Sequence, residues 1–95
     1  MRHYKKTRAN ICKILRVLKQ APLEGKDYMT VGEIAKGAGL HKWTVSRTLD
    51  LFMHPFIDMI VPEELERVGL TIKLVKLKNP NIPEERVLAG LRVRL

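Results

Sequence analysis

The most constraining feature of this sequence is residues 30–52, which predict two short helices joined by a tight turn. Thr30 suits the N-cap of the first helix, because its hydroxyl can accept a free backbone N–H. Glu33, three residues later, can accept the Thr30 N–H in return and complete a capping box. Ala35 is small enough for two helices to cross closely. Gly39 suits the left-handed conformation that ends a helix, so the chain is expected to turn there.

The second helix of the pair is expected over residues 42–53. A helix turns by about 100° per residue, which places an apolar packing face on one side. That face comprises Val45, Thr48, Leu49 and Phe52. The other side and its flanks carry side chains that can contact base edges and phosphates. These candidate DNA-binding residues are Lys42, Trp43, Thr44, Ser46 and Arg47.

The "EIAKGAGL" helix and turn and the "TVSRTLDLF" helix resemble the helix-turn-helix of winged-helix transcription regulators from bacteria and archaea. The resemblance implies a mainly α protein with a small β-hairpin, an α+β fold. It implies a three-helix core, a wing and a C-terminal helix. It also implies sequence-specific binding of double-stranded DNA by a transcriptional regulator, with residues 42–53 as the recognition helix in the major groove.

The composition agrees with a nucleic-acid partner. The net charge is +8 and the isoelectric point is near 10.0, which favours a polyanion. The single cysteine, Cys12, cannot form an intramolecular disulfide, as is typical of a reducing compartment. Neither a signal peptide nor a membrane-spanning run is visible in the sequence. We therefore expect a cytoplasmic, nucleoid-associated protein that does not bind membranes.

The first twenty residues predict an amphipathic helix with one basic side. Its apolar stripe follows helical spacing and comprises Tyr4, Ile11, Ile14, Leu15 and Leu18. Its opposite side carries Arg2, Lys5, Lys6, Lys13 and Arg16, and the segment holds no acid. Because like charges one turn apart repel, a stripe of one sign favours a phosphate backbone as its partner. An acidic protein is the alternative partner.

Residues 57–61 and 70–78 are apolar runs with β-branched residues, and they predict a hairpin, the wing. The loop between them is acidic, with Glu63, Glu64 and Glu66. It is expected to form a helical turn that Pro62 begins and Gly69 ends. The wing tip is therefore not expected to touch phosphate. Lys73 and Lys76 on the second strand are the candidate DNA contacts of the wing.

The tail, residues 79–95, predicts a helix separate from the domain formed by residues 1–78. Asn81 is the expected N-cap. A strand is the competing interpretation, because apolar and basic residues alternate at the end of the chain. The helix would carry an apolar stripe of Val87, Leu88, Leu91 and Leu95. The resemblance implies that such a helix holds a homodimer together.

The sequence shows no pattern of catalytic or metal-ligating residues, so we expect neither an enzyme nor a cofactor, metal or small-molecule ligand. Cys12 lies at the edge of the apolar stripe, which favours a semi-buried structural thiol over a redox sensor. Trp43 is open to three roles: a DNA contact, a cover for Arg47 one turn on, or part of a protein interface. The alternative function is a winged-helix protein-interaction module of transcription, replication or RNA machinery. The acidic loop and Trp43 favour that alternative.

Overall fold

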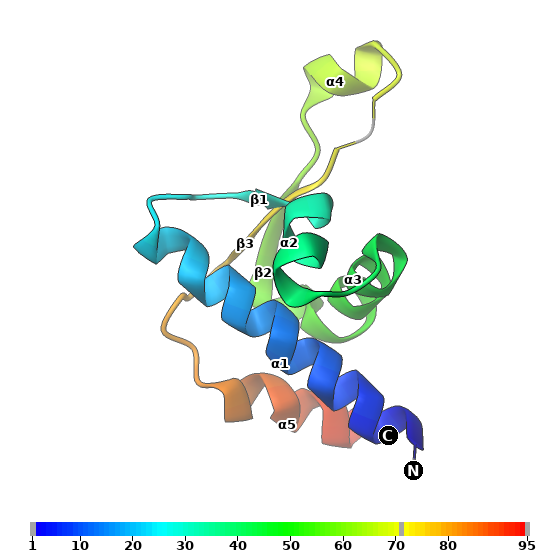
Figure 1. Ribbon diagram of the computed structural model, residues 1–95, viewed down its shortest axis with the longest axis vertical. Coiled ribbons are helices and arrows are strands. Elements are labelled where there is room, and N and C mark those ends of the chain that lie inside the picture. Colours follow the sequence, from blue (N-terminus) through cyan, green and yellow to red (C-terminus); the bar gives the residue numbers. More distant parts are fainter. Residues whose placement is uncertain (1, 71, 95) are drawn as a thin grey trace.

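The computed structural model describes residues 2–70 and 72–94 of the chain, with the side chains of residues 2–4 and 91–94 excepted. The chain is mainly helical and has one three-stranded antiparallel sheet, so the expected mainly α, α+β class is confirmed (Figure 1). The helical elements are α1 (Arg2–Leu23), α2 (Val31–Ala38), α3 (Lys42–Thr48), the π-helical turn η1 (Leu49–Met53), the 3-10 turn η2 (His54–Phe56), α4 (Glu63–Arg67) and α5 (Glu84–Arg94). The strands are β1 (Met29–Thr30), β2 (Ile57–Ile60) and β3 (Leu74–Leu77).

Helix α1 crosses the molecule and supplies much of the core. Its expected apolar stripe is confirmed where side chains are described, since Ile11, Ile14, Leu15 and Leu18 are at most 2% exposed. Tyr4 belongs to the same prediction, but its side chain lies outside the described part. The buried stripe packs against α2, α3 and α5, so α1 is the central support of the fold.

The expected ends of α2 are confirmed. The Thr30 N–H donates to Glu33 Oε1 at 3.0 Å, and the Glu33 N–H donates to Thr30 Oγ1 at 3.1 Å. Gly39 ends the helix with φ of 67°, in the left-handed region. Ala35 is buried, and α1 also approaches α2 closely at Gly37. A Cβ there would lie 3.2 Å from two Val17 methyl carbons of α1.

The second helix of the pair spans residues 42–53 as expected, but its second half is π-helical. This changes the packing face. Met53 is fully buried and Phe52 is only half-buried, whereas an α-helix throughout would bury Phe52. In a π turn each hydrogen bond spans one residue more, so the chain turns less per residue and Met53 rotates toward the core.

The β2–β3 hairpin is confirmed, with Ile57 opposite Leu77 and Ile60 opposite Leu74. The strands are shorter than the apolar runs that predicted them. Strand β1 was not predicted, because two residues are too few to show an alternating pattern. It pairs with β3, so the order in the sheet is β1-β3-β2. Val75 is buried against the helices and fixes the inner face of the sheet.

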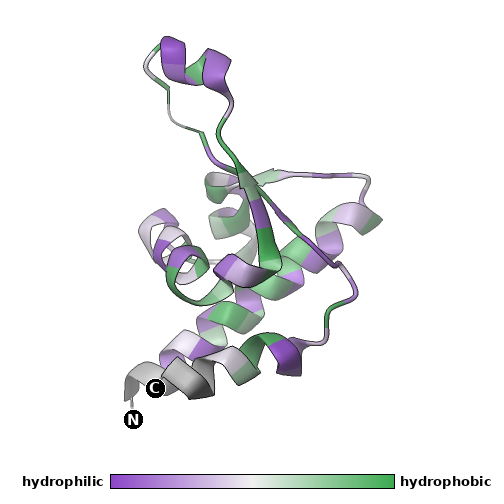
Figure 2. Cartoon of the chain, turned by 180° about the vertical axis from the view of Figure 1, so that it is seen from behind, coloured by the Kyte–Doolittle hydropathy of each residue, from purple (hydrophilic) through white to green (hydrophobic). Residues whose placement is uncertain are grey.

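The connection between β2 and β3 projects from the body of the molecule (Figures 1 and 2). We call residues 60–70 the arm. The expected helical turn is confirmed as α4, which follows Pro62 and ends before Gly69, whose φ is 81°. None of the α4 residues is buried.

The tail forms a helix, not a strand, but Asn81 is not its N-cap. Helix α5 begins at Glu84, directly after Pro83. The Asn81 N–H donates to Asn79 Oδ1 at 3.0 Å, and Ile82 enters the core, so a turn separates Asn81 from the helix. The expected apolar stripe is divided. Val87 and Leu88 lie in the chain's own core, at 0% and 6% exposure, and the side chains of Leu91 and Leu95 are outside the described part.

Candidate nucleic-acid interface

Helix α3 is anchored on one face and open on the other. On its inner face, Val45 is fully buried. Thr48 is also buried, and its hydroxyl is satisfied because Oγ1 donates to the Thr44 carbonyl at 2.7 Å. On the outer side Trp43 is 65% exposed, and the Arg47 guanidinium carbon lies 5.2 Å from the centroid of its ring. A cation over an aromatic face is attracted by the ring quadrupole, so Trp43 favours the orientation in which Arg47 lies over its ring.

A groove of ≈ 380 Å³ separates this face from the first half of α1. Its lining comes from both helices and from η1: Lys6, Thr7, Asn10, Trp43, Thr44, Arg47, Thr48, Leu51 and Phe52. The lining holds two cations, Lys6 and Arg47, and no carboxylate. Within the described residues Arg47 makes no ion pair, so its charge remains available to an anion.

A second hollow, of ≈ 410 Å³, lies on the other side of Trp43 and Arg47. Ser46 lines it, together with Asp50. The Trp43–Arg47 pair therefore stands as a ridge between two hollows of different charge. A phosphate would be attracted to the Lys6 side and repelled from the Asp50 side.

Lys42 lies at the beginning of α3 and reaches back toward α2. A Cβ at Gly32 would be 3.2 Å from Lys42 Cε and 3.6 Å from its Nζ. Gly32 thus leaves the space that the Lys42 side chain occupies. The ammonium group therefore lies beside the N-terminus of α2, at the margin of the exposed face.

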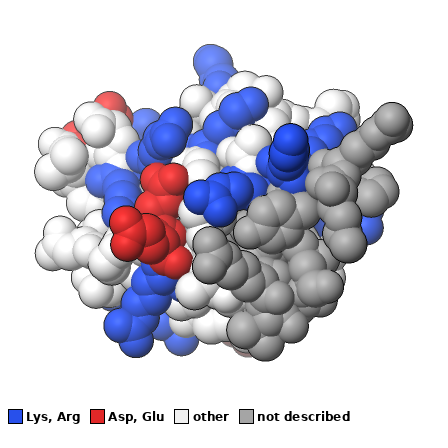
Figure 3. Space-filling model, turned by 90° about the horizontal axis from the view of Figure 1, so that it is seen from below, with Lys and Arg blue, Asp and Glu red and all other residues white. Residues whose placement is uncertain are grey.

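The basic stripe of α1 does not form one continuous surface. Arg16 Nη2 lies 4.0 Å from Glu84 Oε1 at the start of α5, while Lys5, Lys6 and Lys13 are exposed. Figure 3 shows an acidic patch among basic side chains on this end of the molecule. The first twenty residues themselves contain no acidic residue, as predicted, but the fold brings the Glu84 carboxylate to one end of the basic stripe. Arg2 belongs to the same stripe, but its side chain lies outside the described part.

The two strand lysines lie apart from this face. In β3, Lys76 lies between the buried Val75 and Leu77. Successive side chains of a strand point to opposite faces, so the Lys76 side chain lies on the outer face of the sheet. Its Nζ lies 5.0 Å from the centroid of the Tyr28 ring. Lys73 precedes β3 and is half-buried. The structure therefore does not gather Lys73 and Lys76 with the α3 residues.

Cys12 is half-buried, as expected, and is tied to α5. Its Sγ donates to Glu84 Oε1 at 2.9 Å. Burial, and then the neighbouring Glu84 carboxylate, raise the pKa of the Cys12 thiol above its usual value. Cys12, Arg16 and Glu84 together fix the start of α5 against α1.

Sequence reasoning missed Thr7 and Asn10, which line the groove. Their signal was present, because both are polar residues at the margin of the apolar stripe of α1. Within the described residues no cluster could hold a metal ion, and no helix is long and apolar enough to cross a membrane. Comparisons of the chain with protein-family models, with curated proteins and with solved structures found no match.

Proposed function

We propose that this protein is a winged helix-turn-helix transcriptional regulator that binds double-stranded DNA. The observation that carries the proposal is the exposed Trp43–Arg47 pair, on a helix whose other face is anchored, beside a groove with two cations and no carboxylate. The order of the elements supports it. The three helices α1, α2 and α3 precede the β2–β3 hairpin, as a three-helix core with a wing requires.

In this proposal α3 and η1 form the recognition helix and enter the major groove. Arg47 is the principal base reader, because a guanidinium held in one plane can donate two hydrogen bonds to guanine O6 and N7. Thr44 and Ser46 contact bases or sugars on either side of it. Lys6 contacts the phosphate backbone that crosses the groove between α1 and α3. Asp50 repels phosphate and so fixes on which side the backbone passes.

The protein is proposed to act in the cytoplasm, on the nucleoid, as a homodimer without enzymatic activity. A two-fold dimer would place its recognition helices about one DNA turn, ~34 Å, apart and would match palindromic sites. The tail cannot supply the whole interface, because Val87 and Leu88 already pack in the core of one chain.

Fluorescence anisotropy with a duplex oligonucleotide tests the proposal. We expect binding with a slope of log affinity against log salt on the order of −4 to −8, since several phosphate contacts release counterions. Absence of duplex binding at ~50 mM salt, where counterion release favours association, would overturn it. Selection of bound DNA from a random pool would then give the operator, and an enriched palindrome would support the dimer.

A protein-interaction module is the second candidate function. The observation that favours it is the arm, which is acidic and carries exposed apolar side chains. This candidate predicts that the Arg47→Ala variant loses no function, whereas variants of the arm do. The anisotropy experiment separates the two, because an interaction module has no reason to bind duplex DNA with a steep salt dependence.

A further inference from the structure

The arm exposes more apolar surface than its size explains. Six large apolar side chains are exposed in the described part of the chain, and three of them lie here: Ile60 at 45%, Val68 at 70% and Leu70 at 52%. Contiguous exposed apolar side chains with a polar rim are typical of interaction sites. The rim is supplied by Glu63, Glu64 and Glu66, which are all exposed.

The arm differs in charge from the rest of the chain. It holds three of the ten acidic residues and one of the eighteen basic residues, so it carries a charge of −2 and the remainder carries +10. Within the described residues none of its three glutamates makes an ion pair. Its charge is therefore free to pair with a basic partner.

The arm is also weakly supported by its own fold. Helix α4 has only five residues, and its N-cap makes no side-chain hydrogen bond. A helix of this length is not stable by its own hydrogen bonds and needs packing. No core residue of the described chain lies in α4. A surface that packs on the arm would supply what the arm lacks.

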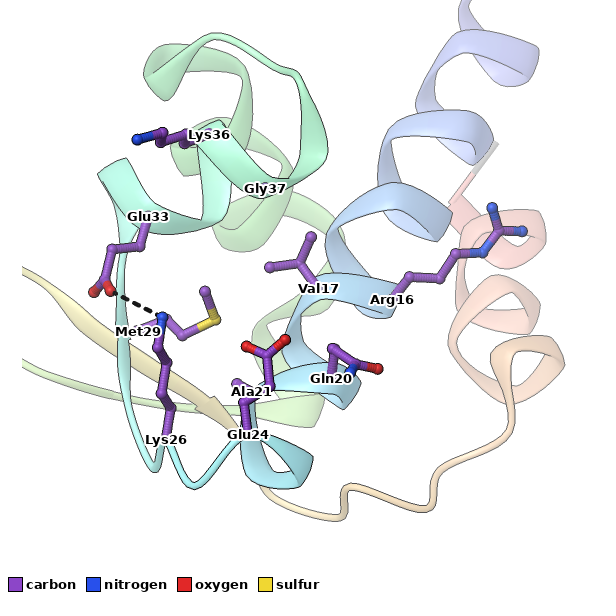
Figure 4. A pocket seen from close by; sticks show the side chains of 10 residues that line it. All are labelled: Arg16, Val17, Gln20, Ala21, Glu24, Lys26, Met29, Glu33, Lys36 and Gly37. Carbon is purple, nitrogen blue, oxygen red and sulfur yellow. Dashed lines mark ion pairs between the residues drawn. The ribbon is translucent and has the colours of Figure 1, made fainter.

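The body offers a hollow of ≈ 620 Å³ between α1 and α2, whose charged lining residues are the basic Arg16, Lys26 and Lys36 and the acidic Glu24 and Glu33 (Figure 4). Val17 and Met29 point into it and give it an apolar floor. One rim is occupied by an ion pair, with Lys26 Nζ 3.8 Å from Glu33 Oε2. Lys36 stands on the α2 rim and makes no ion pair within the described residues. No residue of α3 lines the hollow, so an occupant would leave the DNA-binding face open.

We propose that the arm of one copy docks in the α1–α2 hollow of a second copy, and that the exchange is reciprocal. Val68 and Leu70 cover the apolar floor, and the glutamates of α4 meet Lys36. Direct pairing of two arms is disfavoured, because both carry negative charge. A two-fold exchange repeats the same pair of surfaces twice, as a closed dimer requires. The inference deepens the proposed homodimer and does not depend on DNA binding.

Sedimentation velocity of the full chain at micromolar concentration, without DNA, tests the inference. The wild type is expected to be a dimer. Glu64→Lys should weaken the dimer by at least roughly tenfold in Kd, because it replaces one member of a charge pair at an interface. Glu85→Lys makes the same charge change on α5, away from both surfaces, and should leave the dimer intact.

Charge exchange identifies the receiving surface. Lys36→Glu alone should dissociate the dimer, and Lys78→Glu, an exposed lysine outside the hollow, should not. The double variant Glu64→Lys with Lys36→Glu should recover dimerisation, because the pair is restored with its signs reversed. Circular dichroism of each variant would verify that the chain remains folded.

The results that overturn the inference are distinct from those that overturn the proposed function. A monomeric wild type, a dimeric Glu64→Lys variant or a double variant that stays monomeric would each reject the docked arm. Dissociation by Leu91→Glu but not by Glu64→Lys would assign the interface to the tail. Anisotropy on the same samples reports DNA binding separately, and monomers that still bind a half-site would leave the proposed function standing.

Discussion

The α2–α3 unit and the arm are both exposed and charged, but they are held in place by different means. Trp43 on α3 and Val68 on the arm have similar exposures of 65% and 70%. Trp43 stands on a helix that Val45 and Leu49 anchor, because both side chains are fully buried. Helix α4, in contrast, has no buried residue. An exposed apolar side chain on a rigid element is suited to precise contact. The same exposure on a poorly supported element indicates a surface that lacks its partner.

Truncation of a core residue should separate the two regions most strongly. Leu49→Ala removes a fully buried side chain at the start of η1 and should destabilise the protein by about 2–5 kcal/mol. Leu70→Ala on the arm should cost less than about 0.5 kcal/mol in the monomer. Urea denaturation of both variants, at a concentration where the wild type is monomeric, measures the difference. Equal losses would mean that the arm belongs to the cooperative core.

Side chains that read bases should differ from those that only hold phosphate. Arg47→Ala should lose about 1–3 kcal/mol of affinity for a preferred site and flatten sequence preference. Lys13→Ala should weaken binding to all duplexes about equally, because Lys13 is exposed on the basic side of α1. Anisotropy with a panel of sites measures both variants. An unchanged ranking of sites in Arg47→Ala would show that α3 is not the base reader.

The capping box should give α2 a stability that α4 lacks. Thr30→Ala should cost about 0.5–2 kcal/mol in thermal or urea unfolding, because it leaves a helix N–H without its acceptor. Pro62→Ala at the N-cap of α4 removes no side-chain hydrogen bond, so no comparable loss is expected from capping.

The same box predicts a dependence on pH. The hydrogen bond from the Thr30 backbone lowers the pKa of Glu33 below its usual value. The folded state thus favours the ionised form of Glu33. The stability that ionised Glu33 contributes is present above the ordinary glutamate pKa of ~4.3 and is lost as pH falls through the lowered pKa. The free energy of unfolding of the wild type should exceed that of Glu33→Ala at neutral pH, and this difference should shrink as pH falls through the lowered pKa of Glu33. A constant difference down to pH 2 would contradict the box.

Thiol reactivity should show the smallest contrast. Burial and the bond to Glu84 raise the pKa of the Cys12 thiol and so disfavour the thiolate, which is the form that reacts with iodoacetamide. Cys12 should therefore react slowly near pH 8. A thiol placed on the arm by Val68→Cys, in a Cys12→Ser background, should react faster. As the control, the two thiols should react with iodoacetamide at equal rates in the unfolded protein. Equal rates in the folded monomer would mean that the arm is shielded like α1.

Much of the local structure was predictable from neighbouring residues. The capping box and Gly39 define both ends of α2, and the spacing of apolar residues defines α1. The acidic α4 and the hairpin also follow from short patterns. Trp43 and Arg47 were identified as neighbours for the same reason, since they are one helical turn apart. The sequence likewise predicted that residues 42–53 are helical, but not that the second half forms a π turn.

The sequence alone determined the helices, their caps and the apolar faces, because these depend on residues within a few positions of one another. Tertiary structure alone decided which charges remain free. It brought Glu84 to Arg16 across the chain, joined Lys6 to Arg47 in one groove, and placed Lys76 over Tyr28. It also buried Val87 and Leu88 in the chain's own core, although the sequence analysis placed them in the stripe of a dimer interface. Charge pairing and burial depend on segments distant in the sequence, so only the packed chain could assign them.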